Sequence, residues 1–302
     1  MLNKTIINIF QSSISENLIN ESLAANQFFT TSSIRTAIQA ITQEIDHITE
    51  PQFAFSNLKI GVLAAGNIPF VGFFDMYNAL LTGGQVFVKP SRRDPLMRIF
   101  GDLVHIVDRL PHQVDIILAM GSDQTMQALG DEYPASQLIL RGTEHSAAVL
   151  TGNESSEELR GLADDIFLHS SMGCRSVSHL HLPRAYPLDR LRFDARGQAL
   201  PAAWYDNYRQ QKAISTMRGE KFIDGEFYLL AEGFHSSIAT VGYTFYDNIE
   251  KIDFGSVKLK SIVSQSSIAD YLPLTPTEFG RGQFPKFEFN EALSEILLSL
   301  PS

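Results

Sequence analysis

The feature of this sequence that most constrains its fold is a strand, helix and strand pattern at residues 59–91. KIGVLAA (59–65) is a short apolar run typical of a buried strand, and FFDMYNALLTGG (73–84) has helical spacing and ends at two glycines. QVFVKPS (85–91) then predicts a second strand. Together these segments form a β-α-β unit, whose strands are parallel. We therefore predict an α/β fold with an open parallel sheet.

The same alternation continues downstream. LMRIFGDLVHIVDRL (96–110) carries apolar residues every three or four positions and predicts a helix. VDIILAMGS (114–122) and SQLILRG (136–142) follow as strands, with a short helix between them. Ligands of open parallel sheets bind at the carboxyl ends of the strands. The strand ends therefore nominate candidate ligand-binding residues, namely Asn67, Lys89 and Ser122.

The chain divides by pattern into three parts. Residues 1–55 have apolar positions at helical spacing among polar residues and predict an N-terminal segment of two helices. Residues 56–145 predict a nucleotide-binding α/β domain, and residues 146–302 a second, catalytic α/β domain with a C-terminal tail. In this last part we expect helices at 155–168 and 204–217, a strand at 178–183, and β-rich pieces at 227–231 and 238–246.

Composition excludes several classes of function. The net charge of -10 gives no electrostatic footprint for nucleic acid. The longest apolar run, IGVLAAGNIPFVGFF (60–74), is interrupted by Asn67 and Pro69 and is shorter than the roughly 20 residues that cross a bilayer. The single cysteine cannot form an intramolecular disulfide, and the N-terminus lacks the pattern of a signal peptide. We therefore expect a cytoplasmic protein without a membrane span.

The single cysteine, Cys174, lies in the polar segment SSMGCRS (170–176) after a predicted helix. A nearby helix end or the neighbouring Arg175 would favour its thiolate form, which is an excellent nucleophile. The alternative is a small buried apolar residue, which is the more frequent role of a lone cysteine. The small polar neighbours argue against burial.

Two further motifs fit the binding or activation of a ligand. In AAGNIPF (64–70) a strand runs into a tight turn, where the Asn67 amide can donate to a developing oxyanion; the alternative is an ordinary Asn-x-Pro turn. Lys89 ends a strand before Pro90 and can reach a phosphate or ribose, whereas the alternative is a solvated lysine. The nearby Arg92 and Arg93 favour an anionic ligand.

The turn Gly121-Ser122-Asp123 joins a predicted strand to a predicted helix. The free N–H groups and the dipole at the start of that helix can bind a phosphate, although Ser122 or Asp123 can instead cap the helix. The histidines do not predict a metal site, because they lack Cys or carboxylate partners at the spacings of metal ligands; those considered are His145, His169, His179 and His181. We expect no metal site.

Five segments resemble, in order, the successive signatures of the aldehyde dehydrogenase superfamily, and most of all those of its LuxC-type acyl-CoA reductase branch. They are AAGNIPF, GGQVFVKPS, MGSDQT, LILRGTEHSAAVLTGNES and SSMGCRS, and the likeness spans about residues 56–290. That branch, which includes the fatty-acid reductase of bacterial bioluminescence, reduces an acyl thioester to an aldehyde through an acyl-cysteine and a nicotinamide cofactor. The resemblance implies an aldehyde-dehydrogenase-like fold in a shortened form: a Rossmann-type sheet domain plus a second α/β catalytic domain.

The resemblance assigns roles to individual residues. It places the nucleophile on Cys174, the oxyanion-stabilising asparagine on Asn67 and the ribose-binding lysine on Lys89. Gly121 and Ser122 match the turn beside the cofactor pyrophosphate.

The cofactor segment departs from the family pattern. Ser91 belongs with the cofactor-binding residues, but the next position, where many NAD-using members carry glutamate, is Arg92. A guanidinium matches a 2'-phosphate, so the resemblance implies NADPH rather than NADH. A weaker match places a second ribose-binding carboxylate on Glu232.

The sequence also departs from the family pattern at the position of the general base. Where hydrolytic members carry a glutamate before the cysteine, this sequence has Arg141, and Glu144 is the nearest carboxylate. An acyl-enzyme without a base to activate water exchanges its acyl group with a thiol instead. A third departure is the short segment from Lys89 to Gly121, where we expect a strand and a helix to be missing.

These observations predict NADPH-dependent reduction of an acyl-CoA, by resemblance a fatty acyl-CoA, to an aldehyde. The expected partners are acyl-CoA or an acyl carrier, and the resemblance implies a homodimer. One alternative is an aldehyde dehydrogenase that oxidises aldehydes with Glu144 as base. The other is a reduced paralogue that binds an acyl chain or a nucleotide without catalysis.

Overall fold

A computed structural model of the chain describes residues 1–302 apart from 50–54, 56, 122, 195–198, 285 and 300–302. The chain forms two compact units. The first contains residues 1–26, 34–142 and 285–302, and the second contains 27–33 and 143–284.

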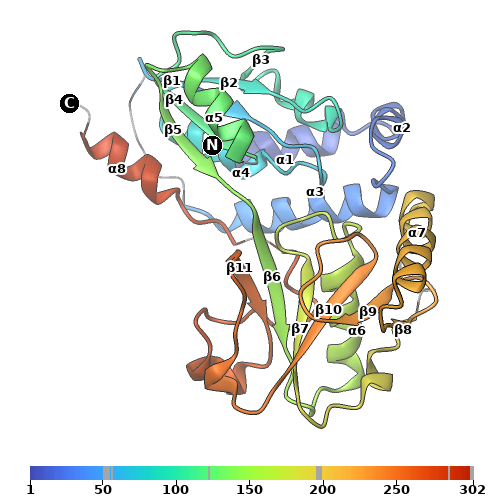
Figure 1. The fold of residues 1–302 in the computed structure, drawn as a ribbon. Helices are drawn as coiled ribbons and strands as arrows, with labels where there is room; N and C mark the ends of the chain where they lie inside the picture. Colours follow the sequence, from blue (N-terminus) through green and yellow to red (C-terminus); the bar gives the residue numbers. More distant parts are fainter. Residues whose placement is uncertain (50–54, 56, 122, 195–198, 285, 300–302) are drawn as a thin grey trace. The chain divides into compact units, whose positions relative to one another are not determined.

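The first unit is built on a five-stranded sheet in the order β3-β2-β1-β4-β5 (Figure 1). Every pairing in this sheet is parallel, as the alternating pattern predicts. The order turns back at β1, so the crevice between β1 and β4 lies at the topological switch point, where ligands of such sheets bind. The strands are β1 (Lys59–Leu63), β2 (Gln85–Lys89), β3 (His105–Ile106), β4 (Ile116–Met120) and β5 (Gln137–Arg141).

Six α-helices accompany this sheet in the described residues. The N-terminal segment forms three helices where two are expected, because the side chain of Ser15 accepts a hydrogen bond from Leu18 N and starts a second helix. The predicted helix before β2 and the short helix before β5 are both present. The helices are α1 (Leu2–Ser13), α2 (Glu16–Ala25), α3 (Thr31–Asp46), α4 (Phe73–Leu81), α5 (Asp123–Glu132) and α8 (Glu291–Ser299).

The predicted helix at 96–110 is wrong. The segment begins with the short 3-10 helix η1 (Pro95–Phe100), in which the buried side chain of Asp94 accepts a hydrogen bond from Leu96 N, and the two-residue strand β3 follows. Five of the apolar residues are nonetheless buried, which accounts for the misleading periodicity; they are Leu96, Met97, Phe100, Val104 and Leu110. A strand and a helical turn therefore remain here in reduced form.

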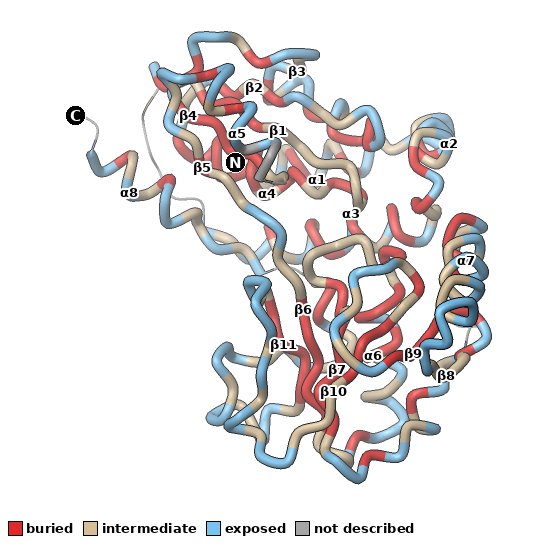
Figure 2. Tube along the Cα trace, in the orientation of Figure 1, coloured by how far each residue is buried: buried red, intermediate tan, exposed pale blue. Residues whose placement is uncertain are grey.

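The second unit is built on a six-stranded sheet in the order β11-β6-β7-β10-β9-β8. Its pairings are parallel except for the antiparallel edge pair β8–β9. Most of β6 and β7 is buried in Figure 2, as expected of the central strands of a covered parallel sheet. The strands are β6 (Glu144–Val149), β7 (Val177–Pro183), β8 (Ile223–Asp224), β9 (Leu229–Glu232), β10 (Thr240–Tyr246) and β11 (Lys258–Val263).

Two α-helices and three short 3-10 helices complete the second unit among the described residues. They are α6 (Ser156–Phe167), α7 (Ala202–Arg218), η2 (Leu188–Leu191), η4 (Ile249–Lys251) and η5 (Ser266–Tyr271). The fully buried Trp204 of α7 donates from Nε1 to Phe227 O at 2.8 Å and packs edge-on against Phe167 of α6. Aromatic residues before β9 thus belong to the core.

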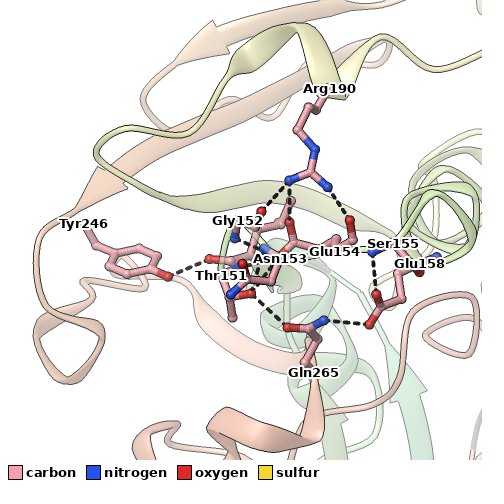
Figure 3. Close-up of polar contacts among 10 residues, drawn as sticks. Thr151, Gly152, Asn153, Glu154, Ser155, Glu158, Arg190, Tyr246 and Gln265 are labelled. Carbon is pink, nitrogen blue, oxygen red and sulfur yellow. Dashed lines mark hydrogen bonds and ion pairs between the residues drawn. The ribbon is translucent and has the colours of Figure 1, made fainter.

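A polar network fixes the connection between β6 and α6 (Figure 3). The buried carboxylate of Glu154 accepts hydrogen bonds from the N–H groups of Thr151 and Gly152, and Arg190 donates to the carbonyl oxygens of Gly152 and Glu154. Ser155 and Glu158 form a reciprocal capping box at the start of α6. This network follows the carboxyl end of β6, whereas Cys174 precedes the parallel strand β7, so the two lie at opposite ends of the sheet.

Candidate active site

The thiol of Cys174 lies in the connection between α6 and β7. The cysteine is free and half-buried, and it is therefore not sealed in the apolar core of the second unit. Helix α6 ends at its C-cap residue, Leu168, and strand β7 begins at Val177. We call residues 169–176 the thiol loop.

After His169, the thiol loop continues with two serines in an unusual backbone conformation. Ser170 and Ser171 have φ angles of 52° and 51°, in the left-handed region that residues other than glycine rarely adopt. Their hydroxyls stabilise this conformation: Ser170 Oγ donates to Phe28 O at 3.2 Å, and Ser171 Oγ donates to Ile166 O at 2.7 Å. Backbone strain held in this way is frequent at functional sites.

The end of the thiol loop is held from α6 and from the segment after β11. Gln283 Nε2 donates to Ser176 Oγ at 2.9 Å and to Asp165 O at 2.7 Å. The Asp165 carboxylate accepts hydrogen bonds from the N–H groups of Gly280 and Gly282 at 2.7 and 2.8 Å. Burial raises the pKa of Asp165 to about 7, and these backbone hydrogen bonds oppose that rise.

Glu144, the candidate base, lies at the amino end of β6 and is held by two lysines of β11. Its oxygens lie 3.0 Å from Lys258 Nζ and 3.3 Å from Lys260 Nζ. Burial raises the pKa of Glu144, but the hydrogen bond from Lys258 and the attraction of Lys260 outweigh it and lower the pKa below its ordinary value. A carboxylate engaged in this way is a weak base.

Arg141, which stands at the family position of the hydrolytic glutamate, ends β5 in the first unit. Its guanidinium forms an ion pair with the buried carboxylate of Asp75 in the first turn of α4. Arg141 thus neutralises a buried acid at the carboxyl end of the sheet. No sequence signal pointed to Asp75 as its partner.

The turn that carries Asn67 is fixed from both sides. Asn26 Nδ2 donates to Gly66 O at 2.7 Å. Phe70, whose φ is 56°, donates from its backbone N to Asp94 Oδ2 at 2.9 Å. Since Asp94 also caps η1, this buried carboxyl joins the Asn67 turn to the segment that follows Lys89.

The last residue of β2 and the segment after it present three cations. Lys89, Arg92 and Arg93 are exposed, and none of them forms an ion pair with another described residue. A Cβ atom at Gly66 would lie 2.7 Å from Ser91 Cβ and closer still to its Oγ, so only glycine allows the two connections to approach this closely. Unpaired cations at the carboxyl end of a parallel sheet fit the phosphates of a nicotinamide dinucleotide.

Gly121 lies directly after β4, and its N–H donates to Arg141 O at 3.2 Å. Ser122 lies outside the described residues, so phosphate binding at this turn stays a prediction. Glu232 is exposed at the end of β9. Its role as a ribose ligand also stays a prediction.

Three histidines are buried in the second unit: His169 in the thiol loop, and His179 and His181 on β7. His179 Nε2 and His181 Nδ1 lie 3.0 and 3.1 Å from the same hydroxyl oxygen of Thr244. Burial lowers the pKa of His179 to about 3 and that of His181 to about 4, so both rings are neutral at pH 7. Within the part of the chain that the structure describes, no group of three or more His, Cys, Asp or Glu side chains is arranged to hold a metal ion.

Asn67 belongs to the first unit and Cys174 to the second. Their joint action on one carbonyl therefore stays a prediction from the sequence.

None of the described helices is both long and apolar enough to cross a membrane.

A five-stranded parallel sheet in one unit and a six-stranded, largely parallel sheet in the other define the class of fold, and solved structures superpose on the chain. An aldehyde dehydrogenase from Bartonella henselae superposes with a TM-score of 0.62 at 11% identity, covering 89% of this chain and 74% of that one. An NAD-dependent benzaldehyde dehydrogenase from Corynebacterium glutamicum gives a TM-score of 0.61 at 14% identity, with 92% and 79% covered.

A third similar structure is the NAD+ complex of an aldehyde dehydrogenase from Bacillus cereus, with a TM-score of 0.59 at 14% identity, 82% of this chain and 67% of that one. No protein-family model matches the chain, and no curated protein matches its sequence. The chain therefore has the aldehyde-dehydrogenase fold in a shortened form, as the resemblance implies.

Proposed function

We propose that the protein is an NADPH-dependent oxidoreductase that reduces a fatty acyl-CoA to an aldehyde through an acyl group on Cys174. Two observations on the second unit carry this proposal together. Cys174 is a free, half-buried thiol in a strained polar loop. The candidate base, Glu144, forms ion pairs with two lysines. An acyl-thiol whose candidate base is engaged in this way favours transfer of the acyl group over its hydrolysis.

The first step is acyl transfer to Cys174. The thiolate attacks the carbonyl carbon of the thioester, a new Cys174 Sγ–C bond forms, and the bond to the CoA sulfur breaks, so that CoA departs as a thiolate. The N–H groups of Gly173, Cys174 and Arg175 make no hydrogen bond with any described residue, and they are candidate donors to the oxyanion. Asn67 is the side-chain candidate for the same role.

The residues that would hold the cofactor are Lys89, Ser91 and Arg92 after β2 and Gly121 after β4, together with Ser122 as a candidate from the sequence alone. Arg92 would pair with the 2'-phosphate, since no described carboxylate competes for its guanidinium. When bound, the nicotinamide supplies the hydride that converts an acyl group into an aldehyde. Cys174 keeps the acyl carbon in place during this step and is regenerated as a thiolate when the aldehyde leaves.

Oxidation of aldehydes is the second candidate, and the similarity to solved aldehyde dehydrogenases favours it. In that reaction a base must activate water to release the acid from Cys174. Glu144 is the candidate, but its two lysine partners stabilise its carboxylate against accepting a proton. The geometry around Glu144 therefore favours the reductive reaction.

The test is a comparison of both directions with the purified protein. Acyl-CoA with NADPH should give aldehyde and free CoA, and the corresponding aldehyde with NADP+ should give much less acid. Faster formation of acid than of aldehyde would establish the second candidate. If the protein binds these ligands but turns them over in neither direction, the result would support the third alternative, a paralogue that binds an acyl chain or a nucleotide without catalysis.

A further inference from the structure

A buried hydroxyl of β6 contacts the backbone of the cysteine itself. Ser146 is fully buried, and its Oγ donates to Cys174 O at 2.8 Å. The same Oγ lies 2.7 Å from Ser261 Oγ on β11, which is also buried. Three segments far apart in the sequence are therefore joined at the carbonyl group of Cys174.

The direction of this chain of hydrogen bonds follows from the number of protons. A serine hydroxyl has one proton to donate, and a carbonyl oxygen can only accept. Since Ser146 donates its proton to Cys174 O, Ser261 must donate to Ser146 Oγ. Ser261 thereby leaves Ser146 only one orientation, with its proton aimed at the thiol loop.

The strands are irregular on both sides of Ser146. The pairing of β6 with β7 shifts register between Ser146 and Ala147, and the pairing of β6 with β11 shifts between Leu259 and Ser261. Bulges that re-aim a side chain are frequent next to active sites. Here the two register shifts occur where the two hydroxyls meet.

The hydrogen bond to Cys174 O also sets the direction of the next N–H group. In a trans peptide the C=O and N–H bonds point in opposite directions, and the described chain has no cis peptide. Since Cys174 O points to Ser146, the N–H of Arg175 points away from Ser146. That N–H donates to no other described residue.

We propose that Ser146 and Ser261 are positioning residues that hold the Cys174–Arg175 peptide so that the Arg175 N–H remains free to donate to the oxyanion formed at Cys174. This proposal deepens the proposed function and rests on Cys174 being the nucleophile. Without the Ser146 hydroxyl, the Cys174 carbonyl loses its partner and the peptide can rotate. Attack on a carbonyl would then slow, although the thiol itself would be unchanged.

Two reactions of the thiol separate positioning from a general loss of structure. Acyl transfer from p-nitrophenyl acetate forms the Cys174 Sγ–C bond and expels p-nitrophenolate through an oxyanion, whereas alkylation by iodoacetamide expels iodide with no oxyanion. Mass spectrometry of the peptide that contains Cys174 follows both rates. The activated ester requires no recognition of CoA, so the result does not depend on the identity of the natural substrate.

The variants are Ser146→Ala and Ser261→Ala, with Ser264→Ala as the matched control. Ser264 is another buried serine near the end of β11, and it donates to a carbonyl of β6, Val149 O, at 2.6 Å. Its removal should lower the thermal midpoint about as much as the removal of Ser146. It should leave both reactions of Cys174 unchanged, because Val149 lies at the far end of β6.

We expect Ser146→Ala to lower the rate of acyl transfer roughly 10- to 100-fold, since an oxyanion donor contributes at least this much, and to change alkylation less than about 3-fold. Ser261→Ala should show a smaller loss of the same kind. Equal losses in both reactions, no loss in acyl transfer, or a wild-type thiol that alkylates but does not accept the acetyl group would overturn the proposal. A wild-type protein that accepts acetyl but never reacts with acyl-CoA would instead contradict the proposed function.

Discussion

The carboxylate of Glu144 lies 3.0 Å from the ammonium nitrogen of Lys258, and Lys260 approaches its other oxygen at 3.3 Å. The Glu144 side chain is only 9% exposed, whereas that of Lys258 is 79% exposed, so the carboxylate is shielded from water and Lys258 reaches it from the surface. The net charge of the three side chains is positive. A carboxylate in this setting holds β11 against β6 and has little tendency to take a proton from water.

Replacing Glu144 therefore distinguishes the two enzymatic candidates. We expect Glu144→Gln, which keeps an oxygen acceptor for Lys258, to change acyl-CoA reduction by less than about 3-fold. If Glu144 were the general base of aldehyde oxidation, the same change would lower acid formation by roughly 100-fold or more. Steady-state rates of both reactions check this, and a large loss of reduction would contradict our reading of Glu144.

Arg92 should decide the choice of cofactor. We expect Arg92→Glu to raise the KM for NADPH roughly 10- to 100-fold, because it removes a charge-assisted hydrogen bond to the 2'-phosphate and adds a repelling charge. The KM for NADH should stay the same or fall, since a carboxylate can accept from a free 2'-hydroxyl. The neighbouring Arg93→Glu is the matched control and should change the ratio of the two KM values less. An unchanged ratio in Arg92→Glu would show that this residue does not contact the phosphate.

Gly66 should tolerate no side chain while Ser91 is present. A Cβ at Gly66 would lie 2.7 Å from Ser91 Cβ, so Gly66→Ala must displace the segment that carries Arg92. We expect a loss of about 1–3 kcal/mol in the free energy of unfolding, together with weaker cofactor binding. The double variant Gly66→Ala, Ser91→Gly removes both contacts with Ser91 and leaves only Arg93 Cβ, at 3.1 Å, close to the new Cβ. It should regain at least half of that loss in denaturant titrations. Simple addition of the two single effects would contradict the predicted contact.

Asp165 should make stability depend on pH. Burial raises its pKa in the folded protein from 3.8 to about 7, so between these values the folded state keeps a proton that the unfolded state has lost. The stability that Asp165 contributes is therefore complete below pH 3.8 and is lost as the pH rises through about 7. Asp165→Asn cannot ionise and should show a smaller decline in the free energy of unfolding between pH 4.5 and 8. If the free energy of unfolding declined equally with pH in the wild type and in Asp165→Asn, the titration of Asp165 would not account for the decline.

The sequence was sufficient for the α/β class and for most strands of the first sheet, because these strands are short apolar runs separated by helical spacing. It predicted no strand at 258–263, where β11 pairs with β6. It was misleading at 96–110, where buried residues follow a helical period, although Leu96 lies in a 3-10 helix and Val104 in an irregular segment. The polar segment around Cys174 correctly argued against burial in the core.

The partners of the site residues were beyond sequence reasoning. Ser146 and Cys174 are 28 positions apart, and their contact depends on two register shifts that no local pattern encodes. Glu144 meets Lys258 only because β11 pairs with β6. One signal was available: Ser146 stands directly before the apolar run of residues 147–150, and a hydroxyl that is buried there requires a partner.

The most direct test of the central claim follows the acyl group on Cys174. The purified protein is mixed with a fatty acyl-CoA, and the mass of the peptide that contains Cys174 is measured before and after the addition of NADPH. We predict an acyl adduct on Cys174 that is absent from Cys174→Ala, that persists in buffer, and that is discharged as aldehyde when NADPH is added. The absence of an adduct, or its discharge as fatty acid regardless of NADPH, would contradict the reductive mechanism.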